Sequence, residues 1–137
     1  MNEINIYIEK LNNNTFRSSD ISLVLKVLRE NAKSGQIELT KNDVSLLQVY
    51  TFALQQLELV NGTASFSVHA GDWRETVDNL SMLRLIIDGM VQKQVISNVS
   101  WNAGGLAIFD IPDPGHYMEY VYSMIRTLLN RLYERYL

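Results

Sequence analysis

The C-terminal stretch Asp113–Leu137 constrains this chain more than any other part of it. Asp113 and Pro114 predict the start of a helix, because Asp caps free backbone N–H groups and Pro has none to leave unpaired. At about 100° per residue, apolar side chains then fill an arc of roughly 180°, whereas an ordinary surface helix needs only about 100°. We expect the rest of the chain to cover this arc, with a partner contributing part of the cover.

Length, composition and charge are those of an ordinary globular domain. The chain has 137 residues, of which 47% are apolar and 20% charged, so we expect one domain over residues 1–137. The net charge is −3 and no basic block occurs, so a general nucleic-acid binder is not expected. No apolar run approaches the ~18 residues of a membrane span, so no membrane partner is expected either.

The absence of cysteine narrows the chemistry further. It excludes disulfides, thiolate catalysis and cysteine-based zinc sites, and it fits a reducing compartment. The first residues also lack the basic region and apolar run of a secretory signal. We therefore expect a cytoplasmic protein without metal or cofactor.

The first 60 residues predict three helices. Residues 3–11 are ambiguous, because their apolar side chains fit both helical spacing and strand alternation, and we prefer a short helix. Ser18 or Ser19 can cap the second helix. Thr40 and Asp43 resemble a capping box and open a helix of about 20 residues, which we expect to pack against the C-terminal helix.

The pattern then changes period. Residues 63–69 alternate between apolar and polar side chains, which predicts a strand. Asp72 can cap a further helix that we expect to end at Gly89. Residues 94–101 and 106–111 read as two strands of a hairpin, because a pair of glycines lies between them. The order of elements indicates an α+β fold with four to five helices packed on a small, mainly antiparallel sheet of about three strands.

Two histidines and two aspartates are the candidates for a metal or acid–base site. His69, Asp72, Asp110 and His116 lie near strand ends, where such groups can converge. Three of them also have a simpler explanation, because Asp72 suits a helix cap, His116 falls in a helical first turn and His69 alternates outward. No HExxH or paired-histidine spacing is present. We therefore expect caps and surface groups, and no catalytic or metal-binding residues.

Sequence motifs favour neither catalysis nor DNA binding. No Gly-x-Ser-x-Gly elbow or phosphate loop occurs. Residues 20–40 loosely resemble the opening of a winged helix, and residues 83–111 resemble a recognition helix followed by a wing. The helix over residues 73–88 carries only Arg74 and Arg84 against three acidic residues, whereas phosphate contacts need Lys or Arg. A winged-helix-like DNA-binding regulator is therefore the alternative hypothesis.

The C-terminal tyrosines favour protein binding. Five of the seven tyrosines lie in the last 21 residues, and Tyr is enriched at interfaces because it combines apolar area with a polar tip. We expect a non-enzymatic, intracellular interaction module of the immunity or inhibitor type, which docks one edge of this helix on a protein partner and occludes it. The expected partner-binding residues are Tyr122, Leu129, Tyr133 and Tyr136, with Arg126 and Glu119 as rim charges.

Two further interpretations of the tyrosine edge stay open. The rings can line the rim of the protein's own core with their hydroxyls in water. The same edge can also join two copies of the chain, which would make the protein a homodimeric adaptor. The expected partner is thus another protein or a second copy.

Overall fold

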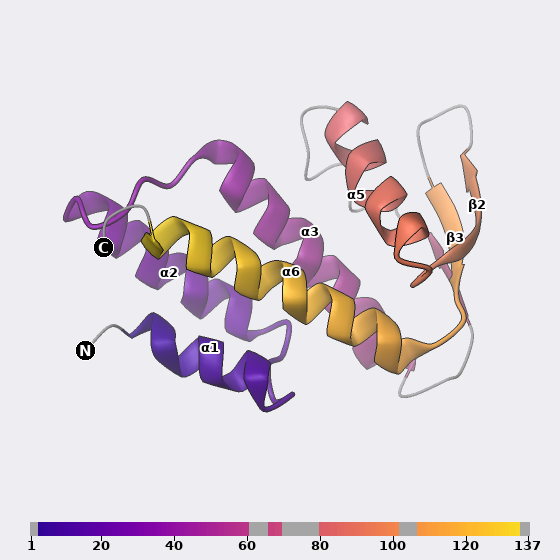
Figure 1. Ribbon diagram of the computed structural model, residues 1–137, viewed down its shortest axis with the longest axis horizontal. Helices are drawn as coiled ribbons and strands as arrows, with labels where there is room; N and C mark the ends of the chain where they lie inside the picture. The colour runs from indigo at the N-terminus through magenta and orange to yellow at the C-terminus, as the bar shows by residue number, and fades with distance from the viewer. Residues whose placement is uncertain (1–2, 61–65, 70–79, 102–106, 135–137) are drawn as a thin grey trace.

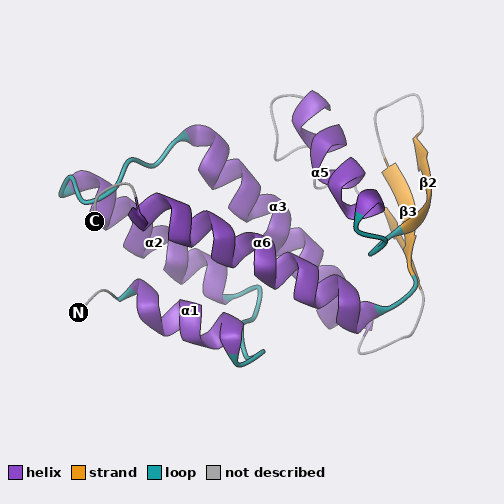
Figure 2. Ribbon diagram, in the orientation of Figure 1, coloured by secondary structure: helices purple, strands orange, loops and turns teal. Residues whose placement is uncertain are grey.

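The computed structural model describes residues 3–60, 66–69, 80–101 and 107–134, and its α+β architecture confirms the expected fold class (Figures 1 and 2). The helices and strands among the described residues are α1 (Ile4–Asn12), α2 (Asp20–Lys33), α3 (Lys41–Val60), β1 (Phe66–His69), α5 (Leu80–Gln92), β2 (Ser97–Trp101), β3 (Ala107–Ile111) and α6 (Pro114–Glu134). The first of these settles residues 3–11 as helix.

The sheet is antiparallel, and β3 lies between β1 and β2. Along β3, Ala107, Phe109 and Ile111 are buried while Ile108 is exposed, so one face of the strand belongs to the core. The register of β2 against β3 is irregular between Ser97 and Ser100. A bulge of this kind twists an edge strand and makes it a poorer template for pairing with another chain.

Helix-on-helix packing supplies most of the described core. α1, α2, α3 and α6 form a bundle, while α5 and the sheet lie at one end of it (Figure 1). α6 starts beside the sheet and runs along the bundle, with α3 as its main packing partner and α1 as a second one. The expected pairing of the helix at residues 41–60 with the C-terminal helix is confirmed.

Two predicted helix starts are confirmed by their hydrogen bonds. The Asp113 carboxylate accepts bonds from the backbone N–H groups of Gly115 (3.0 Å) and His116 (3.3 Å). At α3, the Asp43 carboxylate accepts the Thr40 backbone N–H (3.0 Å), and the Asp43 N–H donates to the Thr40 hydroxyl oxygen (3.2 Å). Both caps involve neighbours in the sequence, which explains why the sequence alone predicts them.

The predicted cap of α2 is wrong. The Ser19 side chain makes no capping hydrogen bond, and Ser18 binds Glu58 of α3 through both its backbone N–H (2.9 Å) and its hydroxyl (2.7 Å). The first turn is instead closed by Asp20, whose carboxylate accepts the backbone N–H of Arg17 (2.8 Å). Ser18, which local sequence rules predict as a cap of α2, therefore binds the carboxylate of Glu58, forty residues further along the chain.

The predicted end of α5 at Gly89 is also wrong. α5 continues to Gln92, and the left-handed residue that ends it is Gln94 (φ 60°), with the Val95 N–H bonded to the carbonyl of Met90 (3.1 Å). Gly89 is small for another reason. A Cβ atom there would lie 3.1 Å from the hydroxyl oxygen of Tyr120 on α6, so the glycine allows the two helices to approach.

Candidate functional site

The predicted tyrosine edge of α6 lies largely inside the protein. Tyr122 and Leu129 are only 4% and 0% exposed. The Tyr122 hydroxyl donates a hydrogen bond to the backbone carbonyl of Phe16, and the two rings meet edge to face with centroids 6.1 Å apart. The expectation that Tyr122 and Leu129 form an exposed docking edge is therefore wrong, because both side chains are buried, and the connection between α1 and α2 covers Tyr122.

The same edge makes two further bonds to the N-terminal helices. The Asn31 side-chain amide donates to the Tyr133 hydroxyl (2.6 Å), and the Arg126 guanidinium donates to the Asn12 side-chain oxygen (2.5 Å). Tyr122, Arg126 and Tyr133 are separated by four and seven residues, so they share one edge of α6. This edge thus docks on the protein's own α1–α2 region.

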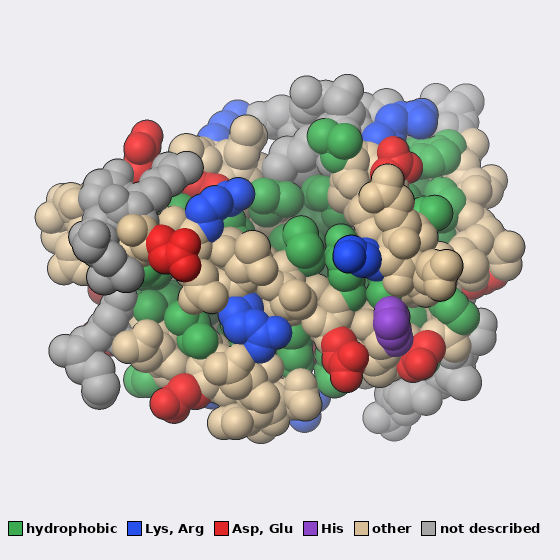
Figure 3. All heavy atoms as spheres, in the orientation of Figure 1, with side chains coloured by type: hydrophobic (Ala, Val, Ile, Leu, Met, Phe, Trp, Pro, Cys, Tyr) green, Lys and Arg blue, Asp and Glu red, His purple; other side chains and the backbone are tan. Residues whose placement is uncertain are grey.

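The remaining residues of the predicted site do not restore a docking edge. Glu119 is exposed, and Tyr136 lies outside the described residues. On the face that carries α6, acidic and basic side chains alternate without forming a patch of one sign (Figure 3). Helical periodicity correctly indicates that something covers the wide apolar arc, but it carries no information about whether the cover is the same chain or another.

Tyr117 is a buried side chain with an unpaired polar group, judged from the part of the chain that the structure describes. It is 0% exposed, and its hydroxyl has no hydrogen-bond partner among the described residues. Burial raises the pKa of this hydroxyl well above its usual range, so the group stays neutral. A buried hydroxyl without a partner has lost its bonds to water and gained none in return.

Replacing Tyr117 with phenylalanine should therefore raise the free energy of unfolding by about 1 kcal/mol, because an unpaired buried hydroxyl is removed. The matched control is Tyr122→Phe, which removes a hydroxyl that donates to Phe16 and should lower that free energy by about 1–2 kcal/mol. Urea unfolding of both variants measures the two changes in the free energy of unfolding. Losses of similar size in both would show that the Tyr117 hydroxyl is bonded in solution.

The His–Asp candidates do not form a demonstrated site. His69 pairs with Ile108 in the sheet register, but its side chain and all of Asp72 lie outside what the structure describes. Asp110 accepts a hydrogen bond from the Asn98 side chain (2.9 Å), and His116 is exposed in the first turn of α6. In the described part of the chain, no three His, Asp or Glu side chains gather closely enough to hold a metal ion.

Two features of the described winged-helix candidate give no support to DNA binding. α3 runs without a break from Lys41 to Val60. On α5, the Arg84 guanidinium stacks over the Trp101 ring at 4.5 Å from its centre, which occupies it in a cation–π contact. The DNA-binding hypothesis stays a prediction, and this contact gives it no support.

A groove lies between α2 and α3, with a volume of about 510 Å³. Volumes of this order are typical of sites that hold a ligand or a partner's side chains. Its floor is apolar and its rim consists of hydroxyl and amide side chains. We call it the α2–α3 groove, and its lining residues are Ser18, Ser19, Ile21, Ser22, Leu25, Gln48, Thr51, Phe52 and Gln55.

The groove stays open because of the residues that face each other across it. Short serine side chains on the first turns of α2 and flexible glutamines on α3 cannot fill the space between the two helices. Ile21 and Leu25 are buried at the floor, and Phe52 is half-buried. The Ser18–Glu58 bonds fix one end of the groove, so both walls are held in place without a partner.

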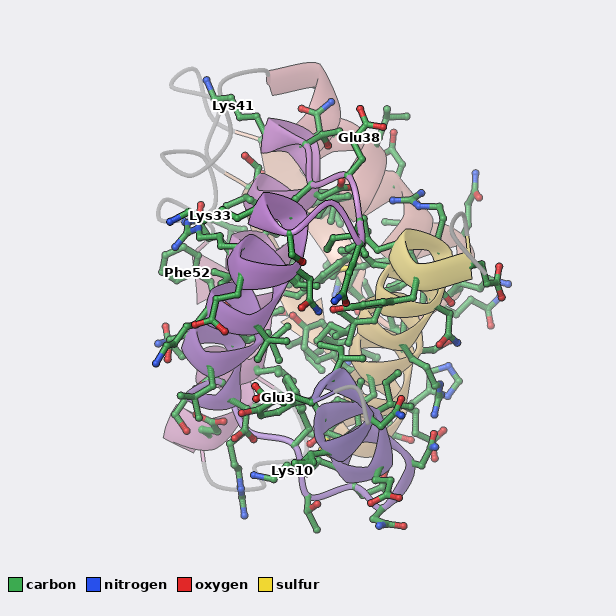
Figure 4. All side chains as sticks on the ribbon, turned by 90° about the vertical axis from the view of Figure 1, so that its left-hand side faces the viewer. Glu3, Lys10, Lys33, Glu38, Lys41 and Phe52 are labelled. Carbon is green, nitrogen blue, oxygen red and sulfur yellow. The ribbon has the colours of Figure 1, made fainter. Side chains whose placement is uncertain are left out.

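A basic stripe continues the rim of the groove along α2. Lys26 and Arg29 lie one helical turn beyond the groove-lining residues Ser22 and Leu25, and Lys33 lies one turn further on. All three cations are exposed, and none forms an ion pair with another described residue. Figure 4 shows Lys33 and Phe52 on the same edge of the molecule, away from α6. We call Lys26, Arg29 and Lys33 the basic stripe.

Three acidic groups near the groove already have partners, while Glu30 is exposed beside the basic stripe. The Asp20 carboxylate lies 3.1 Å from the Lys10 ammonium, the Asp43 carboxylate lies 3.3 Å from the Arg131 guanidinium, and Glu58 binds Ser18. The basic stripe is thus a local excess of positive charge on a chain whose net charge is −3. The tyrosine pattern of the C-terminal helix does not point to this stripe, although cations spaced by three and four residues on a predicted helix are a signal that the sequence contains.

A second hollow, of about 320 Å³, lies where the start of α6 meets the end of α3. Its lining includes Phe16, Met118 and Tyr122, and it also contains the charged side chains of Arg17 and Glu58. Because Glu58 and Tyr122 are engaged in bonds that hold the bundle together, this hollow reads as a seam between helices.

Comparisons of the chain with family models, with curated proteins and with solved structures found no match. None of the described helices is both long enough and apolar enough to cross a membrane.

Proposed function

We propose that this protein is a non-enzymatic interaction module of the immunity or inhibitor type, which binds a protein partner in the α2–α3 groove and acts by occluding the partner's surface. The groove is the observation that carries the proposal. It replaces the tyrosine edge of α6 as the docking surface, because that edge is covered by α1 and α2. The absence of cysteine supports a place in the cytoplasm.

The groove suits a partner's apolar side chain better than a small substrate. Ile21, Leu25 and Phe52 supply a floor that a leucine or aromatic side chain can bury against. The surrounding hydroxyls and amides can hydrogen-bond at the edge, as the polar rim of a protein interface does. Both walls are regular helices, so little ordering is needed on binding.

The lining also supports a role without catalysis. General acid–base chemistry needs a titratable side chain within hydrogen-bond reach of the reacting group. None of the residues that line the groove is a His, Asp, Glu, Lys, Tyr or Cys. The Glu58 carboxylate reaches one of the groove serines, and both of its oxygens are engaged by Ser18.

Site-specific photo-crosslinking tests the proposal. A photoreactive amino acid at Gln55, which is exposed at the mouth of the groove, should crosslink to a distinct protein in extract of the native host. The matched control places the same amino acid at Ser123, an exposed position on α6, and should give no such product. Adding Ser22→Trp should suppress the Gln55 product by about tenfold or more, because the indole occupies the groove.

The outcomes separate the candidate functions. Equal products from Gln55 and Ser123, or a Gln55 product that Ser22→Trp leaves unchanged, would contradict binding in the groove. A Gln55 product that forms in the purified protein alone would favour the homodimeric adaptor instead. Thermal unfolding of Ser22→Trp should match that of the unsubstituted protein, since Ser22 is exposed.

A further inference from the structure

We infer that the occupant of the α2–α3 groove is an acidic amphipathic helix, whose apolar ridge enters the groove while its carboxylates pair with Lys26, Arg29 and Lys33. This inference rests on the proposed function and adds the chemistry of the partner.

The charge around the groove selects an acidic partner. The groove itself has an uncharged lining, and the charges that extend its rim along α2 are Lys26, Arg29 and Lys33. The one exposed acid on this stretch of α2 is Glu30, which lies one helical turn from both Lys26 and Lys33, so the stripe keeps an excess of positive charge. Because Asp20, Asp43 and Glu58 already have partners, a ligand's carboxylates compete for the stripe with the exposed Glu30 rather than with these three acids.

The walls of the groove select a helix. An extended peptide gains affinity by pairing its backbone with free N–H and C=O groups at a sheet edge. The α3 wall consists of helical turns, and on the α2 side the backbone N–H groups of Ser18, Asp20 and Ile21 are already bonded to the Glu58 carboxylate and to the carbonyls of Arg17 and Ser18. Recognition must therefore use side chains, and a third helix laid along two others is the arrangement that packs a ridge of side chains into such a groove.

The spacing of the stripe predicts the spacing of the partner's acids. Lys26 to Lys33 spans about 10 Å along α2, at about 1.5 Å per residue. A helix lying roughly alongside matches this span with Asp or Glu at positions i, i+3 or i+4, and i+7. Its apolar residues should follow the same spacing on the neighbouring face.

A displayed library of helix-favouring peptides, each about 16 residues long, tests the inference by selection on the full-length protein. Selected peptides should carry more Asp and Glu than Lys and Arg beside an apolar stripe. Labelled copies should bind the triple variant Lys26→Glu, Arg29→Glu, Lys33→Glu about tenfold or more weakly, and binding to the unsubstituted protein should weaken with added salt. Lys93→Glu reverses an exposed charge at the end of α5 and serves as the control.

The possible outcomes test the groove and the acidic helix separately. Selected peptides that Ser22→Trp blocks, but that are neutral or basic, would contradict an acidic helix as the partner and would leave the groove as the binding site. The same conclusion would follow if the triple charge reversal did not weaken their binding. Peptides that bind regardless of Ser22→Trp would overturn the groove itself. Phosphatidylserine vesicles or a single-stranded oligonucleotide could bind through the basic stripe more tightly than any selected peptide does. That result would contradict a protein partner and indicate a polyanion instead.

Discussion

Replacing Leu129 with alanine should lower the free energy of unfolding by about 2–5 kcal/mol, because it removes a side chain from a closely packed core and leaves a cavity. Leu129 is 0% exposed and lies on the α6 edge that α1 and α2 cover. Urea unfolding followed by circular dichroism measures the change. The result decides the role of α6, because truncating a residue at an intermolecular edge would weaken binding to the partner rather than lower the free energy of unfolding.

The matched control for Leu129→Ala is Thr127→Ala on the same helix. Thr127 is exposed, so its truncation should change the free energy of unfolding by only about 0.5 kcal/mol. Equal small effects at both positions would mean that Leu129 is not packed inside one copy. In that case the tyrosine edge would return as the candidate docking surface.

The protein should lose stability steeply above pH 10. Burial raises the pKa of Tyr50 to about 12, with a further increase from nearby Tyr120 and an opposing contribution from Arg131. Burial also raises the pKa values of Tyr117, Tyr120 and Tyr122. In the unfolded chain these hydroxyls ionise near pH 10. Between that pH and the higher folded pKa values, the folded state binds more protons than the unfolded state.

The sign follows from the bound protons. Below about pH 10 these hydroxyls are neutral in both the folded and the unfolded state, so stability does not change with their ionisation and is fully present. Above that pH, each tyrosine that stays neutral only in the folded state lowers the free energy of unfolding by about 1.4 kcal/mol per pH unit. The two most strongly shifted tyrosines, Tyr50 and Tyr117, should together give about 2.7 kcal/mol per unit, enough to unfold a typical domain near pH 12.

Denaturant unfolding at intervals from about pH 8 to about pH 12 measures this slope. The double variant Tyr50→Phe, Tyr117→Phe removes both titrating groups and should flatten the curve by about 2.7 kcal/mol per pH unit. An unchanged slope would show that these hydroxyls ionise in the folded protein as readily as in the unfolded chain. Tyrosinate absorbance provides an independent record of the same ionisations.

Local rules explain which parts of the fold the sequence predicts. The caps at Asp113 and at Thr40 with Asp43 depend on residues within three positions, and the structure contains both. The long apolar faces of residues 41–60 and 113–137 correctly predict two helices that pack together. Gly35, with φ 80° just beyond α2, likewise occupies the position that its conformational freedom suggests.

The failures all involve partners that are distant in the chain. Ser18 is held by Glu58, and Gly89 is small because Tyr120 approaches it, and neither neighbour is visible from local spacing. The same holds for the docking edge, since an apolar arc looks identical whether α1 or another protein covers it. The groove depends on how far apart two helices settle, which hydrophobic patterns do not specify.

Titration of a selected acidic peptide into isotope-labelled protein, followed by amide NMR shifts, tests the central claim most directly. The account predicts that the shifts concentrate on residues 18–33 of the α2 region and residues 48–55 of α3, and that the outer turns of α6 around Ser123 and Thr127 stay unchanged. Shifts centred on α6 with α2 silent would contradict it, because they would place the partner on the helix that the protein's own bundle encloses.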